Sequence, residues 1–173
     1  MSSSNKTPHL RLNQWIASDP ILRTDFNFDN SKLDSAVNAR ALVTLAKTTL
    51  TQAAATLPFS LTDLDLTKCV QLQLFLDPVM SAEAAVALQI NETTAVTLGT
   101  MAADGSRGLE IHLSLLPGGV GGWWTAPGGT GTTSGTFRIS NVTAEDIATL
   151  TLGCAGSASF ASGTTCLLCG VKL

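Results

Sequence analysis

The sequence predicts a mainly β protein with an N-terminal helix: an antiparallel, jelly-roll-like β-sandwich head on a helical, coiled-coil stalk. Over residues 31–57, small or apolar side chains recur at a spacing that alternates between three and four, typical of a helix that packs along a narrow seam. After Pro58 the period changes to two, typical of strands with one buried face. We therefore expect an N-terminal segment (1–30), a helical oligomerisation stalk (31–57) and a β-sandwich head (58–173).

The N-terminal segment contains a helix-start signal behind a polar tail. The carboxylate of Asp19 can accept hydrogen bonds from free backbone N–H groups, and Pro20 suits the first position of a helix. We expect a short helical turn after Pro20 and then a break at Thr24–Asn27. Asp29 or Asn30 would cap the long helix that follows.

The predicted stalk helix has alanine at every second seam position. Alanine lets helices approach closely but buries little surface, and the threonines around Leu50 lower helix propensity. Such a helix needs partners, so we expect it to associate with copies of itself. Packing on the chain's own head, or an extended Thr48–Thr51 end, are the alternatives. The seam residues are Ala36, Ala39, Val43, Ala46, Leu50, Ala53 and Leu57.

The head contains short segments in which apolar and polar residues alternate, separated by turn signals. This pattern indicates strands with one buried and one solvated face, as in antiparallel sheets. A glycine- and threonine-rich loop is expected between Gly118 and Gly135. The expected strands are 60–66, 70–76, 86–90, 94–98, 109–115, 137–139, 149–154 and 167–173.

The adjacent tryptophans Trp123 and Trp124, within that expected loop, are the most suggestive surface feature. Exposed indoles stack on sugar rings and anchor protein interfaces. On a strand, one of the two would face the core and the other the solvent. Contact with a ligand or partner and plain core or intersubunit packing therefore both stay open. His112 faces outward with no visible Asp or Cys partner, which favours a solvated or interface residue.

No enzyme motif is recognisable, and the acidic residues show no pairing typical of a glycosidase. Cys166 and Cys169 have the spacing of a metal or redox motif, but on a strand their sulfurs point to opposite faces. We expect no enzymatic activity, no cofactor and no metal. Buried free thiols are expected, and a disulfide between Cys154 and Cys166 across the final hairpin is the alternative.

The composition narrows the class of partner. Of 173 residues, 45% are hydrophobic and only 13% charged, a balance typical of rigid, β-rich and often multimeric proteins. The net charge of −3 and the scattered Lys and Arg residues exclude a nucleic-acid surface. No apolar run is long enough to insert into a membrane. The first residues lack the apolar run of a secretory signal, so we expect synthesis in a cytoplasm and release by lysis.

The segment Leu10–Asp34 resembles the N-terminus of tail-fibre and baseplate-type structural proteins of phages and prophages of Firmicutes. It combines Leu-Asn-Gln-Trp, Asp-Pro and Asp-Phe-Asn at the offsets of that group. The resemblance implies a segment that docks on a phage particle, a trimer, and a distal head that binds host surface. Residues 35–173 follow the plan of that group only loosely. The implied attachment residues are Leu12, Trp15, Asp19, Pro20, Arg23, Asp25, Phe26 and Asn27.

We therefore expect a non-enzymatic virion protein, a homotrimeric tail or baseplate fibre. Its N-terminal segment would bind another virion protein. Its head, with Trp123 and Trp124, would bind a host cell-surface glycan or a neighbouring virion protein. The alternatives are a capsid-decorating head fibre of the same architecture and a monomeric carbohydrate-binding module.

Overall fold

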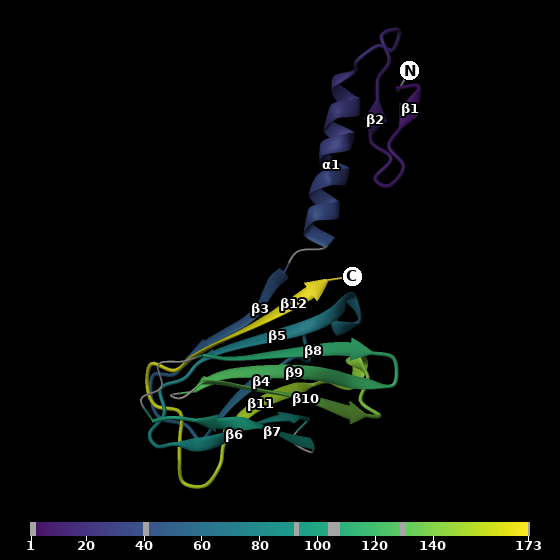
Figure 1. The fold of residues 1–173 in the computed structure, drawn as a ribbon. Helices are drawn as coiled ribbons and strands as arrows, with labels where there is room; N and C mark the ends of the chain where they lie inside the picture. Colours follow the sequence, from purple (N-terminus) through teal and green to yellow (C-terminus); the bar gives the residue numbers. More distant parts are fainter. Residues whose placement is uncertain (1–2, 40–41, 92–93, 104–107, 129–130, 173) are drawn as a thin grey trace. The chain divides into compact units, whose positions relative to one another are not determined.

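The computed structural model describes residues 3–39, 42–91, 94–103, 108–128 and 131–172. The chain divides into two compact units, Met1–Ala41 and Leu42–Leu173, which we call the N-terminal unit and the β unit and describe separately (Figure 1). Most of the described chain is β-strand, in antiparallel sheets, together with one α-helix. That helix lacks the length and apolarity needed to cross a membrane, and no other described helix has them.

The N-terminal unit consists of strands β1 (Asn5–Lys6) and β2 (Asn13–Gln14) and helix α1 (Arg23–Ala39). The backbone N–H of Asn13 donates a hydrogen bond of 2.8 Å to the Asp29 carboxylate, which ties β2 to the helix. The described side chains that are buried in this unit are polar, and its large apolar side chains stay partly or fully exposed. The described residues of this unit are therefore held together by polar contacts and form no apolar core.

Helix α1 both begins and ends earlier than the sequence predicted. The expected break at Thr24–Asn27 is wrong, because these residues are helical. Asp25 lies in the first turn, where a carboxylate interacts favourably with the free N–H groups of a helix. The expected continuation to residue 57 is also wrong, because α1 ends at Ala39.

The predicted stalk, 31–57, divides between the two units. Strand β3 (Leu42–Thr49) pairs along its length with β12 (Thr165–Lys172). Its valine and threonines suit a pleated strand. Pairing with β12 satisfies the backbone N–H and C=O groups of this segment, whereas a lone helix of such low propensity would be only marginally stable. A coiled-coil seam through the seven predicted residues is therefore wrong: Ala36 and Ala39 lie on α1, Val43 and Ala46 on β3, Leu50 and Ala53 after β3, and Leu57 in β4.

The β unit contains two antiparallel sheets. The large sheet has the strand order β10-β9-β8-β5-β12-β3 and the small sheet the order β4-β11-β6-β7. The further strands of the large sheet are β5 (Cys69–Asp77), β8 (Leu109–Leu116), β9 (Gly119–Gly128) and β10 (Gly131–Ser140). Those of the small sheet are β4 (Thr56–Ser60), β6 (Ala84–Ile90), β7 (Thr94–Met101) and β11 (Thr149–Cys154). Single 3-10 turns lie at Leu66–Lys68 and Ala144–Asp146.

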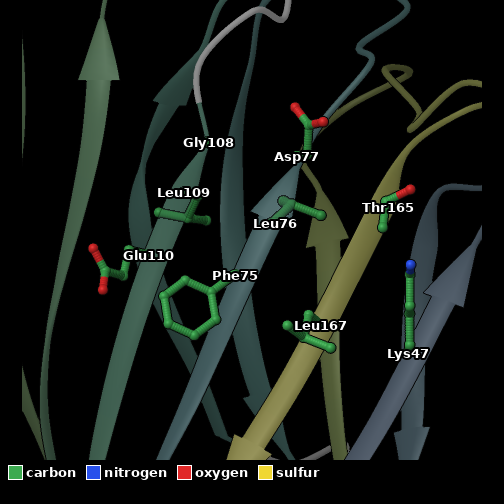
Figure 2. Close-up of a pocket in the computed structure, with 9 residues that line it drawn as sticks. All are labelled: Lys47, Phe75, Leu76, Asp77, Gly108, Leu109, Glu110, Thr165 and Leu167. Atoms are coloured by element: carbon green, nitrogen blue, oxygen red, sulfur yellow. The ribbon is translucent and has the colours of Figure 1, made fainter. Parts of the chain in front are cut away.

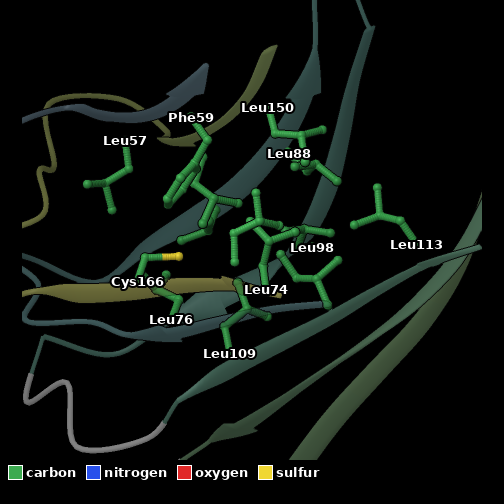
Figure 3. Packing of buried hydrophobic residues seen from close by; sticks show 14 of the residues in the cluster. Leu57, Phe59, Leu74, Leu76, Leu88, Leu98, Leu109, Leu113, Leu150 and Cys166 are labelled. Carbon is green, nitrogen blue, oxygen red and sulfur yellow. The ribbon is translucent and has the colours of Figure 1, made fainter. Parts of the chain in front are cut away.

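Side chains from both sheets share one apolar core, an arrangement consistent with a β-sandwich. Figure 3 shows Leu74 and Leu109 of the large sheet among Leu88 and Leu150 of the small sheet. Leu57, a predicted seam residue, is 1% exposed in this core. Burial of these apolar side chains supplies the main driving force for folding of the unit.

The predicted alternation is confirmed in part for the central strands. In β5 the leucines are buried while Gln71, Gln73 and Phe75 alternate with them, but Val70, expected inward, is 41% exposed, and β6 alternates as expected. In β8 and β11 the expected leucines are buried, but His112 and Thr151, expected to face outward, are each only 8% exposed as well. The predicted strand at 60–66 is wrong, because β4 ends at Ser60. In β12 the buried residues include Cys166 and Leu168, so its inner face is not the predicted one.

The glycine-rich segment expected as a loop forms most of the β9–β10 hairpin instead. Its glycines make room for aromatic rings. A Cβ at Gly135 would lie 2.7 Å from Nε1 of Trp124, and one at Gly122 would lie 2.5 Å from Cζ of Phe137. The glycines predict a loop because glycine usually marks turns, whereas a strand that is closely approached by a side chain also requires glycine.

Candidate functional site

The outer face of the large sheet brings Trp123, His112 and Gln73 side by side. His112 on β8 lies opposite Trp123 on β9 and Gln73 on β5 in the strand register. Residues two apart on a strand share a face, so Glu110 joins His112 and Gln71 joins Gln73. We call these five residues, Trp123, His112, Glu110, Gln71 and Gln73, the Trp123 face.

The two tryptophans point to opposite sides of β9. Trp124 packs against the core, and Trp123 is 43% exposed on the outer face. The Trp123 indole stacks on the His112 imidazole, with ring centroids 3.9 Å apart and planes at 10°. Because His112 comes from β8 and covers one face of the indole, the other face is turned toward β10 on the opposite side of β9. The residue opposite it there is Thr136, which is small and exposed.

Hydrogen bonds hold the His112 ring in place. Nε2 of His112 lies 2.8 Å from Oε1 of Glu110, and Nδ1 lies 3.0 Å from Nε2 of Gln71. The amide nitrogen of Gln71 can only donate, so Nδ1 accepts and Nε2–H donates to Glu110. Nε2 of Gln73 then donates to Oε1 of Gln71 over 3.5 Å. The network orients the imidazole and, through the stack, the indole.

A pocket of about 550 Å³ lies next to the Trp123 face on the same side of the sheet (Figure 2). Glu110, Phe75, Leu167 and Lys47 occupy one row across four neighbouring strands. Figure 2 shows Glu110 and Lys47 flanking the apolar pair, and we call this site the Phe75 pocket. Its lining residues are Lys47, Phe75, Leu76, Asp77, Gly108, Leu109, Glu110, Thr165 and Leu167.

Charge at the Phe75 pocket is confined to its rim. Within the described parts of the chain, neither Lys47 nor Asp77 has a side-chain hydrogen bond or ion pair, and Glu110 contacts His112. Phe75 lies edge-on to His112, with ring centroids 6.5 Å apart, which connects the pocket to the Trp123 face. Together, the Trp123 face and the Phe75 pocket therefore offer an exposed indole, neutral glutamine amides and an apolar pocket.

The predicted attachment residues all lie in the N-terminal unit. Trp15 stacks on Phe26 with centroids 4.9 Å apart, and Asp19 accepts hydrogen bonds from the backbone N–H groups of Ser4 and Ile16. The hydrogen bond from the Ser4 hydroxyl, followed by those two, lowers the pKa of Asp19 below its ordinary value. Leu12 is half-buried, Asp25 partly buried, and Pro20, Arg23 and Asn27 are exposed.

Three buried polar atoms of the described residues have no hydrogen-bond partner: Nε1 of Trp15, Oδ2 of Asp25 and Oδ1 of Asp29. All three belong to the N-terminal unit. Oδ1 of Asp29 lies 3.8 Å from the Lys32 ammonium, an ion pair without a hydrogen bond. Burial raises the pKa of Asp29, but the hydrogen bonds from Asn13 and the charges of Lys32 and Lys6 outweigh it, so this pKa is lowered overall.

The four cysteines are free thiols. Cys154 lies on β11 and Cys166 on β12, which belong to different sheets, so the two do not face each other across a hairpin. Burial raises the pKa of Cys154 to about 11 and that of Cys166 to about 12, which keeps both protonated. Among the described residues no group of three or more His, Cys, Asp or Glu side chains is arranged to hold a metal ion.

Sequence reasoning missed the hydrogen-bond partners of His112. Glu110 could have been identified from the sequence as a partner of His112, because residues i and i+2 of a strand share a face. Gln71 could not be identified from the sequence as a partner, because it is brought next to His112 only by the pairing of β5 with β8.

Comparisons with protein-family models, with curated proteins and with solved structures gave no match.

Proposed function

We propose that the chain is a non-enzymatic binding protein whose β unit binds a neutral saccharide on the Trp123 face. The observation that carries this proposal is the exposed Trp123 indole, held by a hydrogen-bonded His112–Glu110–Gln71 network on an open sheet face. The C–H face of a sugar ring stacks on an indole, and a pre-oriented indole loses little conformational entropy on binding. The glutamine amides supply both donors and acceptors for sugar hydroxyls.

The proposal is tested by replacing Trp123 with alanine and measuring saccharide binding by glycan array and calorimetry. Loss of the stack should weaken binding at least tenfold. Val79→Ala is the matched control, because Val79 is 44% exposed and lies outside the site. If Trp123→Ala binds the same glycans with unchanged affinity, the Trp123 face is not the binding site.

Glycoside hydrolysis is the second candidate, and one observation favours it. Glu110 and Asp77 line the same pocket, and a pair of carboxylates is what most glycosidases use. Against it, Glu110 is engaged by His112, and Asp77 is an exposed rim residue. Incubation of the bound glycan with the protein, followed by mass spectrometry, should return the glycan intact. Cleavage that is lost in Glu110→Gln would support hydrolysis instead.

We further propose that the N-terminal unit attaches the protein to a phage particle and that the chain forms a trimer. The support for attachment is the resemblance of Leu10–Asp34 to phage fibre proteins. Support for self-association comes from an apolar stripe at Leu22, Phe26, Leu33 and Val37, whose spacings of four, seven and four suit packing between helices. These side chains are 39%, 47%, 41% and 69% exposed within a unit whose described residues form no apolar core.

Solution mass separates a fibre, on a tail or a capsid, from a monomeric carbohydrate-binding module. The wild-type chain should be a trimer, and Leu33→Asp with Val37→Asp should yield monomers with a folded β unit. Ser35→Asp, on the opposite side of α1, is the control and should keep the trimer. A monomeric wild type at micromolar concentration would exclude the fibre.

Attachment has a separate test, incorporation into particles. Trp15→Ala removes the stack on Phe26 and should abolish incorporation while leaving the oligomer mass unchanged. Incorporation at the wild-type level would exclude a docking role for Trp15. The virion protein that copurifies with the wild type identifies whether the tail, baseplate or capsid carries the chain.

A further inference from the structure

The Phe75 pocket has a chemistry that a plain sugar ring does not match. Its floor is apolar, formed by the side chains of Phe75 and Leu167, and its flanks are the acceptor Glu110 and the donor Lys47. A hydroxyl group placed on the apolar floor would lose hydration without gaining a partner, which is unfavourable. A group suited to the pocket carries a small apolar end together with one donor and one acceptor.

The acetamido group of an N-acylated amino sugar has these three parts. Its methyl group can lie on Phe75 and Leu167, its N–H can donate to the Glu110 carboxylate, and its carbonyl oxygen can accept from the Lys47 ammonium. Glu110 retains acceptor capacity while it binds His112, because a carboxylate has about four acceptor sites. A volume of about 550 Å³ is within the range of small-ligand pockets and accommodates a whole amino-sugar ring.

The pocket is close enough to Trp123 to serve the same ligand. Phe75 lies two strands from Trp123 and two residues further along the strand direction. Strand spacings of about 4.8 Å and a rise of about 3.4 Å per residue place the two Cα atoms about 12 Å apart. Because the free face of the indole is turned toward β10 and the pocket lies on the β5 and β12 side, an oligosaccharide that stacks on Trp123 and also fills the pocket has to pass over the Trp123 and His112 rings and to span more than this separation.

We infer that the Phe75 pocket is a subsite for an N-acetylated hexosamine, so the ligand of the β unit is an oligosaccharide that contains this sugar. This inference rests on the proposed saccharide binding and adds the substrate class. It predicts discrimination by the acyl group, which saccharide binding by Trp123 alone does not require.

The test uses matched tetrasaccharides that differ only at C2: N-acetylglucosamine against glucose, and N-acetylgalactosamine against galactose. Calorimetry should show that one N-acetylated member binds at least tenfold tighter than its unacetylated counterpart. A glucosamine tetramer, which carries the free amine, should bind no better than the glucose tetramer. Tighter binding of the glucosamine tetramer would show that the carboxylates of Glu110 and Asp77 attract its positive charge. That result would overturn the inference that the pocket binds the N-acetyl group.

The role of the pocket is tested with Leu167→Thr, which removes part of the apolar floor and replaces leucine by a β-branched residue that suits a strand. This variant should lose the preference for the acetylated sugar and keep its affinity for the plain sugar. Val171→Thr, on the same strand and outside the pocket, is the control and should behave as wild type. A preference that survives Leu167→Thr in a variant with wild-type melting temperature would remove the Phe75 pocket from the site.

The outcomes separate the two proposals. Equal binding of acetylated and plain members, with loss of both in Trp123→Ala, overturns the inference and leaves saccharide binding intact. Binding to no member of either pair, with the wild type folded by circular dichroism, contradicts both. A preference for the acetylated sugar that is lost in Leu167→Thr supports both the saccharide-binding proposal and the assignment of the subsite.

Discussion

Two adjacent glycines of β9 allow the packing beneath the Trp123 face to be tested by substitution. A Cβ at Gly122 would lie 2.3 Å from the carbonyl oxygen of His112 and 2.5 Å from Cζ of Phe137. Contacts this short force a displacement, and the His112 carbonyl belongs to the backbone of β8, which cannot rotate away. At Gly121 the nearest atom is Cδ1 of Leu116 at 3.7 Å, an ordinary van der Waals contact.

Gly122→Ala should therefore lower the free energy of unfolding by about 3 kcal/mol, the upper end of the cost of overpacking. In a domain of this size that corresponds to a fall in melting temperature of roughly 10 °C. Gly121→Ala should be neutral or stabilise by up to about 1 kcal/mol, because alanine restricts the unfolded chain more than glycine does.

Urea denaturation followed by tryptophan fluorescence, with calorimetric melting, measures both variants. Because β8 carries His112, Gly122→Ala should also disturb the stack on Trp123 and weaken saccharide binding in the fraction that stays folded. Equal stability of Gly121→Ala and Gly122→Ala would refute the packing described for β8, β9 and β10.

Three further predictions address the corrected fold and the ionisable groups. Leu57→Ala should cost the β unit about 2–5 kcal/mol by urea denaturation, because the side chain is 1% exposed in the core, whereas a seam residue would change only the oligomer mass. Cys166 and Cys154, whose pKa values are raised to about 12 and about 11, should resist alkylation at neutral pH until urea unfolds the unit, because both thiols stay protonated; fast labelling of the native protein would contradict the raised pKa values. The pKa of Asp19 is lowered by its hydrogen bonds, so its stabilisation of the N-terminal unit is present above the ordinary value of 3.8 and is lost as the pH falls through the lower folded value. Protection of the Ser4 amide against hydrogen exchange, taken relative to its intrinsic rate at each pH, should fall over that acidic range in wild type, and in Asp19→Asn it should be low at every pH. An unchanged protection profile would contradict the role of the carboxylate.

The stretch after Ala39 explains why the stalk was mispredicted. Its apolar residues fit a spacing of three and four over 36–57, but within β3 they form two adjacent pairs, Leu42–Val43 and Leu45–Ala46, which by themselves decide neither a helix nor a strand. The deciding interaction is the pairing with β12, in which Thr49 lies opposite Thr165, far away in the sequence. A local pattern contains no information about that pairing, and for a low-propensity segment tertiary pairing outweighs the local preference.

The prediction of a loop where β9 and β10 form a hairpin was also wrong, but for a different reason, the two structural uses of glycine. Glycine marks a turn when the backbone needs a positive φ, and it marks close packing when a ring occupies the place of a side chain. Gly122 and Gly135 belong to the second kind, because Phe137 and Trp124 lie where their Cβ atoms would be. Only the tertiary packing distinguishes the two uses.

For the candidate site, the sequence by itself determined the residue types and the alternation of faces. Period two in β5 and β8 separates the buried leucines from Gln71, Gln73, Glu110 and His112, because successive side chains of a strand point to opposite faces. The tertiary structure decided that Trp123 is an outer strand residue stacked on His112, and that Phe75, Leu167 and Lys47 share a pocket. The physical reason is register: strands from distant parts of the chain align through backbone hydrogen bonds, and their order in the sheet depends on the whole core.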